Sequence, residues 1–408
     1  MKCGLLGQTL GHSYSPQIHA SLGNYSYELF EKQPDELENF LRYDDFHGLN
    51  VTIPYKKAVI PYCAELSPTA AALGAVNTIV RRSDGTLIGH NTDHFGFETM
   101  LKHSKLNVFG KKVLVLGSGG ASNTAVAVLT HAGAEVIVIS RNGENHYGNL
   151  HLHKDAAVIV NCTPVGMYPN TDESPVNLDL FPDLEGVLDV IYNPARTKLL
   201  LNAEVKGLTT CNGLLMLVAQ AKESAEWFLG KKLPDDLLTS VYQSLKRQME
   251  NIVLIGMPGS GKSTVGKLLA AKTGKEFVDA DSVLETTAGK TIPEIFKEEG
   301  EAHFRALESQ VLKDLGKRSG TVIATGGGCV TREENYASLH QNGKIVWLTR
   351  DIAKLPTKGR PLSQTTDLSK MYETRKPLYA QFADCIISND GTAEDTAKAI
   401  LKLWEGLP

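Results

Sequence analysis

The stretch 256–264 reads GMPGSGKST; it follows the apolar run 252–255, IVLI, and precedes the helical pattern 265–270, VGKLLA. This order of strand, glycine-rich turn and helix fits the phosphate-binding spacing G-x-x-x-x-G-K-[ST]. In such a loop backbone N–H groups converge on phosphate oxygens, and the positive end of the following helix adds to the attraction. A glycine-rich turn between a strand and a helix is common, but the Lys-Ser pair with these flanks favours nucleotide binding. Lys262 then reaches the terminal phosphates, and Ser263 can ligate magnesium.

The loop lies past the middle of a 408-residue chain, so we expect a complete unit before it and two or three domains in all. Hydrophobic residues at 42%, charged residues at 22% and a net charge of −4 indicate a globular protein with no electrostatic case for nucleic acid. The six cysteines are scattered without a C-x-x-C pair, which favours reduced thiols over disulfides or a zinc site. With no secretory signal pattern and no apolar run of membrane-spanning length, we expect a soluble cytoplasmic protein.

Four short polar motifs follow one another in the first hundred residues: SYSP at 13–16, NVTIPYK at 50–56, GAVNT at 74–78 and NTD at 91–93. Each has an ordinary explanation alone. A serine can cap a helix that starts at Pro16, and a lysine at a strand-to-helix junction is usually solvated. In this order, however, the motifs resemble those of shikimate dehydrogenase, and the resemblance covers roughly residues 1–247.

The resemblance implies that 3-dehydroshikimate is reduced to shikimate, with Lys56 and Asp93 as the catalytic pair. Ketone reduction develops an alkoxide, which a positioned ammonium can stabilise or protonate while a carboxylate holds that ammonium. It remains open which group passes the proton. His94 stands where the family usually has Gly. The implied substrate contacts are Ser13, Ser15, Thr52, Lys56, Asn77, Asp93, Tyr192 and Gln220.

A dinucleotide turn, GSGGAS at 117–122, lies between an apolar strand at 111–116 and a helix, and a second strand follows at 135–139. This is a Rossmann-type βαβ unit. The second strand ends in Ser140-Arg141 instead of an acid, which favours NADP over NAD. Asn145 replaces a further basic residue, and the stretch 142–154 is too short for the usual helix and strand, so we expect a trimmed domain with modest affinity for the 2′-phosphate. The implied cofactor residues are Gly117, Ser118, Gly119, Gly120, Ala121, Ser140, Arg141, Thr163 and Gly213. Met216 follows in a motif of the same family, and we expect it to pack in the core.

Further motifs follow the phosphate loop: D-x-D at 279–281, GEAHFR at 300–305, GGG at 326–328, RPL at 360–362 and RKPLY at 375–379. Paired acids alone are usually surface carboxylates, but the series resembles shikimate kinase from about residue 251 to the end. The lid stretch 351–360 is short for that family, and Lys354 or Lys358 can substitute for its usual second cation.

The kinase resemblance implies that Asp281 binds shikimate hydroxyls and acts as base, while Ser263 and, through water, Asp279 hold Mg²⁺. Arg360 would stabilise charge on the transferring phosphoryl group from the lid. The implied ATP contacts are Gly256, Gly259, Ser260, Gly261, Lys262, Ser263, Thr264 and Arg360. The implied shikimate contacts are Asp281, Arg305, Gly326, Gly327, Gly328 and Arg375.

Together these resemblances predict an α/β chain with two successive activities, using NADP(H), ATP and Mg²⁺. A two-domain dehydrogenase unit, with an α/β substrate domain (1–92 plus 214–247) and a Rossmann-type NADP domain (93–213), precedes a P-loop domain like that of nucleoside-monophosphate kinases (251–408). The partners expected are small-molecule substrates, without nucleic acid or membrane; oligomeric state stays open. Two alternatives remain: a regulatory protein with inert sites, although all four key catalytic residues are present, and a quinate-using, NAD-linked first half.

Overall fold

The computed structural model describes residues 1–11, 13–355 and 368–406, apart from the side chain at 405. It divides into unit 1, Met1–Tyr192 with Leu199–Leu245, and unit 2, Asn193–Lys198 with Lys246–Pro408. Three sheets organise the described residues, two in unit 1 and one in unit 2. Among the helices of this described part, none is both long and apolar enough to cross a membrane.

The first sheet is mixed and has the order β2-β1-β3-β5-β6-β4. The strands β2, β1 and β3 run parallel, whereas β5 pairs antiparallel with both β3 and β6. Its buried face centres on Leu6, Phe46, Leu49 and Ile79. The strands are β1 (Lys2–Gly7), β2 (Ser26–Glu31), β3 (Gly48–Val51), β4 (Glu65–Leu66), β5 (Thr78–Arg81) and β6 (Leu87–His90). The helices of this region are α1 (Ser15–Leu22), α2 (Leu37–Tyr43), the 3-10 segment η1 (Ile60–Tyr62) and α3 (Pro68–Leu73).

The second sheet is fully parallel, with the order β11-β10-β9-β7-β8. Alternate residues along β7 enter opposite cores: Val113 and Val115 pack with α4 and α5, and Leu114 and Leu116 pack on the other face. This two-sided burial is why the strands read as continuous apolar runs. The strands are β7 (Lys112–Leu116), β8 (Glu135–Ile139), β9 (Val158–Asn161), β10 (Gly186–Asp189) and β11 (Thr209–Asn212). The helical segments are α4 (Asp93–Ser104), α5 (Gly120–His131), η2 (Tyr147–His153), η3 (Leu178–Leu180) and α6 (Lys198–Val205).

The order of the second sheet reverses at β7, since β8 lies on one side of it and β9 on the other. In open parallel sheets such a switch point forms a ligand crevice at the carboxyl ends of the strands. The turn 117–122 leaves β7 at this edge. The stretch 142–154 holds only the 3-10 segment η2, so the trimmed connection expected from the sequence is confirmed.

Two long helices follow the second sheet. α7 (Leu214–Leu229) begins after Gly213 and ends at Gly230, which has a left-handed φ of 62°. Its far end returns to the first sheet, where Phe228 fills the space that a Cβ on Gly48 would need. α8 (Asp235–Met249) starts at the acids after Pro234, as the sequence predicts, and it buries Val241 and Leu245.

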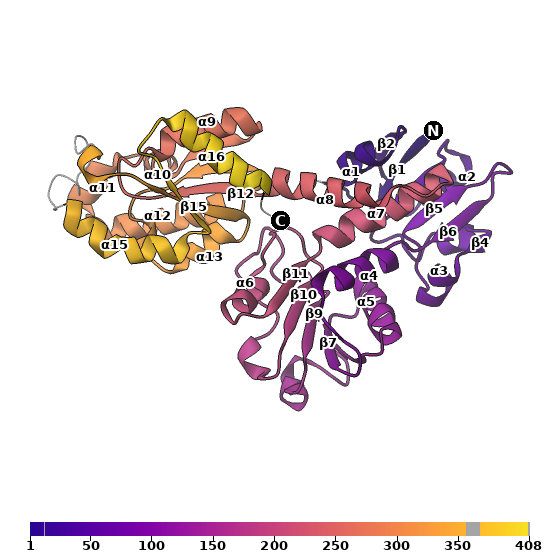
Figure 1. The fold of residues 1–408 in the computed structure, drawn as a ribbon. Helices are drawn as coiled ribbons and strands as arrows, with labels where there is room; N and C mark the ends of the chain where they lie inside the picture. Colours follow the sequence, from indigo (N-terminus) through magenta and orange to yellow (C-terminus); the bar gives the residue numbers. More distant parts are fainter. Residues whose placement is uncertain (12, 356–367, 407–408) are drawn as a thin grey trace. The chain divides into compact units, whose positions relative to one another are not determined.

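Unit 2 is built on a parallel sheet of order β13-β14-β12-β15-β16. α9 and α16 cover one face and α12, α13 and α15 the other (Figure 1). The strands are β12 (Asn251–Ile255), β13 (Glu276–Asp279), β14 (Thr321–Ala324), β15 (Gly343–Thr349) and β16 (Cys385–Ser388). The helical segments are α9 (Lys262–Thr273), α10 (Ala280–Ala288), α11 (Ile292–Glu298), α12 (Gly300–Gly316), η4 (Cys329–Thr331), α13 (Glu334–His340), η5 (Ile352–Lys354), α15 (Leu368–Phe382) and α16 (Ala393–Gly406).

All five strands of unit 2 end at one edge, so the segments that follow them are brought together there. The phosphate loop leaves β12, and the three glycines follow β14. Asp279 ends β13, and the lid stretch follows β15. Residues 193–198 also belong to unit 2, where Ala195 N donates to Asn342 Oδ1 at 2.7 Å and Arg196 Nη1 donates to the His340 carbonyl at 3.0 Å.

Candidate active sites

A cavity of about 320 Å³ in unit 1 collects residues from distant parts of the chain. They come from β1 and the loop after it, the start of α1, β3 and the turns after it, the residue before β5, the starts of α4 and α5, the loop after β10, and α7 with the glycine before it. All eight substrate residues expected from the sequence line it: Ser13, Ser15, Thr52, Lys56, Asn77, Asp93, Tyr192 and Gln220.

Lys56 and Asp93 form an ion pair in this cavity, with Nζ 2.6 Å from Oδ2. Their side chains are only 27% and 15% exposed, so Lys56 is not a solvated surface lysine. Lys56 follows β3 in a run of turns that leads to η1, which corrects the expected strand-to-helix junction: no α-helix starts there. The pair places a cation and a carboxylate against one cavity wall.

A buried hydrogen-bond network fixes the start of α4 behind Asp93. Asn77 Oδ1 accepts the backbone N–H of Thr92 at 2.7 Å, and the Thr92 hydroxyl lies 2.9 Å from Ser224 Oγ on α7. Ser224 Oγ also accepts from Asn50 Nδ2 at 2.8 Å. Because Asn77 serves this network, it positions Asp93 as well as lining the cavity.

The ordinary explanation for the first serines does not apply. Tyr14 is the N-cap of α1 and makes no side-chain capping bond, while Ser13 Oγ accepts the backbone N–H of Ser15 at 3.2 Å. Both serines line the cavity instead.

Sequence reasoning missed two kinds of lining residue in unit 1. Asn50 lines the cavity and is nearly fully buried; its place in β3, two residues before Thr52, which directly follows the strand, was the available signal. Met216 packs against the core, as predicted, but also lines the cavity. His94 lines a different cavity, between α4 and α5, and is not among the residues that line the substrate cavity.

The dinucleotide turn has the features of an anion site. Gly117 has φ 106°, and α5 starts at Gly120 with Ser118, Gly119 and Gly120 exposed. A Cβ on Gly119 or Gly120 would meet no atom within 4 Å, so the space in front of the helix is open. Thr163 follows β9 and is held by Asn161, whose Oδ1 accepts its hydroxyl at 2.7 Å.

Of the cofactor contacts expected from the sequence, only Ala121 and Gly213 line this cavity. A Cβ on Gly213 would lie 2.0 Å from the Val190 carbonyl, so the chain's own backbone requires this glycine. Ser140 and the exposed Arg141 lie after β8, outside that cavity. Asn145, noted from the sequence only as the replacement of a basic residue, also holds this segment together. Its carbonyl accepts from Ser140 N, and its Oδ1 lies 2.9 Å from His153 Nε2.

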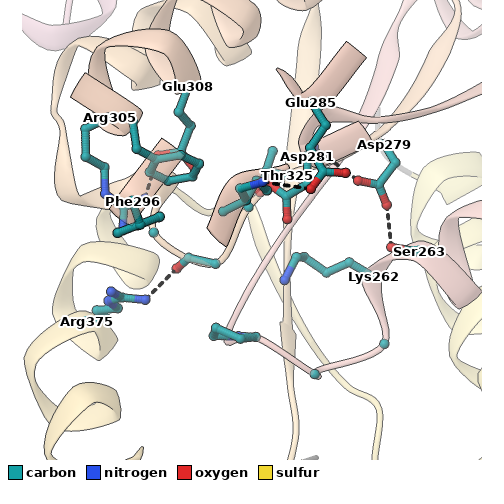
Figure 2. Close-up of a pocket in the computed structure, with 18 of the residues that line it drawn as sticks. Lys262, Ser263, Asp279, Asp281, Glu285, Phe296, Arg305, Glu308, Thr325 and Arg375 are labelled. Carbon is teal, nitrogen blue, oxygen red and sulfur yellow. Dashed lines mark hydrogen bonds and ion pairs between the residues drawn. The ribbon is translucent and has the colours of Figure 1, made fainter. Parts of the chain in front are cut away.

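The second cavity, of about 480 Å³, lies in unit 2 at the carboxyl edge of its sheet (Figure 2). Lys262 is buried, and its Nζ donates to the carbonyls of Gly256 at 2.9 Å and Met257 at 3.1 Å. The loop needs its glycines, since Gly256, Gly259 and Gly261 have φ of 144°, 86° and 97°. Ser260 is fully buried, whereas Thr264 lines the cavity.

Two carboxylates face the loop from β13 and α10. Ser263 Oγ donates to Asp279 Oδ2 at 2.6 Å, and Asp279 Oδ1 caps α10 by accepting the Asp281 N–H at 3.1 Å. Burial raises the pKa of Asp281 to about 6; Lys262 opposes this rise, and Asp279 and Glu308 add to it. The hydroxyl and carboxylate are suitable ligands for Mg²⁺.

Two arginines, Arg305 and Arg375, line the cavity on the side away from Asp279 and Asp281 (Figure 2). Arg305 Nη1 donates to Glu308 Oε2 at 2.7 Å, and Arg375 Nη1 donates to the Gly327 carbonyl at 3.2 Å. The three glycines leave room for their neighbours: a Cβ on Gly327 would lie 2.6 Å from Pro258 Cδ, one on Gly328 2.2 Å from Arg305 Nη1 and one on Gly326 2.5 Å from Glu308 Oε1.

Glu308 was the main residue that sequence reasoning left without a role in unit 2. It is buried, it holds Arg305, and its Oε1 has no hydrogen-bond partner in the described structure. Its spacing of three residues from Arg305 on one helix was the signal. Other lining residues that were not assigned are Glu285, Phe296, Phe304, Thr325 and Arg350. Arg360 and Lys358 lie outside the described residues.

Comparison with known proteins separates the chain into the same two parts. A family model described as "Shikimate kinase" matches residues 258–405, and one described as "Shikimate dehydrogenase substrate binding domain" matches residues 5–79. The shikimate dehydrogenase (NADP(+)) of Clostridium perfringens strain SM101 is 36% identical over 265 residues, covering 60% of this chain and 97% of the relative.

Solved structures agree for the first part. Shikimate dehydrogenase 1 from Peptoclostridium difficile is 37% identical with a TM-score of 0.55, covering 60% of this chain and 97% of its own. The shikimate 5-dehydrogenase of Thermus thermophilus, solved in complex with NADP(H) and shikimate, is 30% identical with a TM-score of 0.55, covering 60% of this chain and 99% of its own.

Proposed function

Because the first 60% of the chain belongs to the shikimate dehydrogenase family and a shikimate kinase domain follows it, we propose which of its residues carry out the two reactions. The chain is a bifunctional shikimate-pathway enzyme. Its first activity is the NADPH-dependent reduction of 3-dehydroshikimate to shikimate. Its second is the phosphorylation of shikimate by ATP with Mg²⁺, giving shikimate 3-phosphate.

In the first reaction the Lys56–Asp93 pair acts on the carbonyl. When bound, NADPH supplies the hydride. The Lys56 ammonium stabilises or protonates the oxygen that develops negative charge, and Asp93, 2.6 Å away, holds the ammonium and accepts a hydrogen bond from a neighbouring substrate hydroxyl. The hydroxyls of Ser13, Ser15 and Thr52 orient the ring and its carboxylate.

The remaining substrate contacts in unit 1 are the polar ends of Asn77, Tyr192 and Gln220, which line the same cavity. For the cofactor, the N–H groups at the start of α5 are suited to the pyrophosphate. The exposed Arg141 is suited to the 2′-phosphate and favours NADP over NAD. The open space over Gly119 and Gly120 supports this placement.

In the second reaction Asp281 accepts the proton of the attacking shikimate hydroxyl. Its raised pKa, about 6, suits a base that works near neutral pH. Lys262 and the loop N–H groups hold the ATP phosphates, and Ser263 with Asp279 holds Mg²⁺. Arg305 and Arg375 bind the shikimate carboxylate, for which planar guanidinium groups are well suited. Arg360 completes the proposed set from the lid.

We further propose three domains: 1–92 with 214–247 for the dehydrogenase substrate, 93–213 for NADP, and 251–408 for the kinase. The bonds of Ser224 on α7 to Asn50 and Thr78 support assigning α7 to the first domain. We propose a cytoplasmic enzyme whose partners are its small-molecule substrates, not nucleic acid or membranes.

The observation that carries this proposal is that each substrate set from the sequence lines a single cavity, one in each unit. The test is a coupled assay on the purified chain, with 3-dehydroshikimate and NADPH first and ATP with Mg²⁺ second. We expect NADPH to be consumed in the first step, measured by its absorbance. In the second step we expect ADP to form only when shikimate is present. Failure of either step would favour an inert, regulatory protein for that half, and faster turnover of quinate with NAD⁺ would favour the quinate alternative.

A further inference from the structure

Few of the positively charged side chains that line the kinase cavity are placed to bind the nucleotide phosphates. The described residues that line it include four acids, Asp279, Asp281, Glu285 and Glu308, and four bases, Lys262, Arg305, Arg350 and Arg375. The side chain of Arg305 is bound to Glu308 and Glu301, and that of Arg375 donates to Gly327. In Figure 2 both lie on the other side of the cavity from Lys262 and Ser263 of the phosphate loop.

Arg350 stands at the phosphate loop instead. It follows β15, the strand that pairs with β12, and β12 leads directly into the loop. Its Nη1 lies 3.4 Å from the Gly259 carbonyl, in the middle of the loop. It lines the same cavity as Lys262 and Ser263.

The guanidinium of Arg350 has unused donor capacity. Its Nε is buried and has no hydrogen-bond partner among the residues that the structure describes. Leaving a charged donor without an acceptor is costly, and the part of this guanidinium that lines the cavity is placed to bind an anionic oxygen there. A guanidinium with several donors in a fixed fork matches a phosphate group better than an ammonium does.

Lys354, the substitute cation considered from the sequence, is engaged elsewhere. Its Nζ lies 3.5 Å from the carbonyl and 3.8 Å from Oδ1 of Asp390, and its side chain is half exposed. It does not line the cavity.

We propose that Arg350 is a second phosphate-binding cation of the kinase site and, with Lys262, binds the phosphate chain of ATP. The inference rests on the proposed kinase function and adds a nucleotide-binding residue to it. The residue that directly follows β15 thereby supplies the second cation that was expected from the lid. Arg350 acts on the phosphates and not on the adenosine part of the nucleotide or on shikimate.

The test compares Arg350→Gln and Arg350→Lys with Lys354→Gln as the matched control from the same segment. Calorimetry on the full chain measures binding of ATP, ADP and adenosine, with saturating NADP⁺ present to block the other nucleotide site. Arg350→Gln should weaken ATP and ADP binding by about tenfold to a hundredfold, as expected for a charge-assisted hydrogen bond, and leave adenosine binding unchanged. Arg350→Lys should fall between the wild type and Arg350→Gln, and Lys354→Gln should match the wild type.

Unchanged ADP binding in Arg350→Gln overturns the proposal, and so does an equal loss of adenosine binding, which would assign Arg350 to the nucleoside. If Arg350→Gln melts early, a folded Arg350→Met variant decides, because it keeps an apolar side chain of similar length without the charge: wild-type ADP binding by this variant also overturns the proposal. A wild-type chain that binds ATP but does not phosphorylate shikimate contradicts the kinase function and not the role of Arg350. A wild-type chain that binds no ATP contradicts both.

Discussion

Replacing Asp281 by Asn should make unit 2 more stable near neutral pH while abolishing phosphorylation. Burial, with Asp279 and Glu308 nearby, raises the pKa of this carboxyl from 3.8 to about 6 despite Lys262. A rise of this size means that ionising Asp281 costs the folded state about 3 kcal/mol relative to the unfolded chain. Asn has nearly the same shape and no charge, so the variant avoids this cost, with about 3 kcal/mol as the upper bound of the gain.

The sign of the pH dependence follows from the raised pKa. Above about pH 6 the wild-type carboxyl is ionised in both states, and the folded state bears the whole cost. As pH falls from 6 to 3.8 the folded carboxyl takes up its proton first and the cost declines; below 3.8 both states are protonated and it disappears. The advantage of Asp281→Asn should therefore be full near pH 7.5 and should shrink through this window.

The assay is thermal unfolding of the full chain, measured by calorimetry at about pH 7.5 and about pH 5. Guanidinium unfolding at the same two pH values gives the free energy of unfolding. The kinase and dehydrogenase rates are measured in parallel. For a domain of this size, each kcal/mol shifts the melting temperature by roughly 2–4 °C, so a rise of several degrees is expected. Asp314→Asn is the control, because this carboxylate on α12 is exposed and its loss should change the stability little. If Asp281→Asn is no more stable than the wild type near pH 7.5, burial does not penalise the ionised carboxylate. If the variant retains near-normal kinase turnover, Asp281 is not the general base.

Four further outcomes are expected. Lys56→Ala should lower dehydrogenase turnover by about 10² or more, as for an acid–base group, and leave the kinase unchanged; near-normal NADPH oxidation would contradict the assignment. Lys262→Met should abolish phosphorylation and spare the reductase, whereas loss of both rates would reveal coupled halves. Arg141→Asp should favour NADH over NADPH; a wild type that already prefers NADH would refute the role of Arg141. A fragment 1–249 should reduce 3-dehydroshikimate. A fragment 1–227 lacks α8 and the end of α7, so it loses about 1.5–3 kcal/mol of stability for each large side chain that these helices bury, and it should melt at a lower temperature. Equal melting temperatures would refute the boundary after α8.

Local patterns in the sequence determined the elements and their order. The apolar runs before 117–122 and 256–264 became β7 and β12, and the helices after them start where the glycines end. The signals are strong because strand, turn and helix are encoded by neighbouring residues. The short segment between β8 and β9 was predictable for the same reason, since its length alone leaves no room for a helix and a strand.

Only the tertiary structure decided which distant side chains meet. Glu308 lies on α12 and faces the glycines after β14, so its contact with Gly326 has no local signature. Ser224 meets Asn50 across 174 residues, and that bond helps to fix the wall behind Asp93. His94 follows Asp93 in sequence but lines another cavity, because successive residues of a helix point about 100° apart. Arg350 stands at the phosphate loop because β15 pairs with β12, and that pairing is a property of the sheet and not of either segment alone.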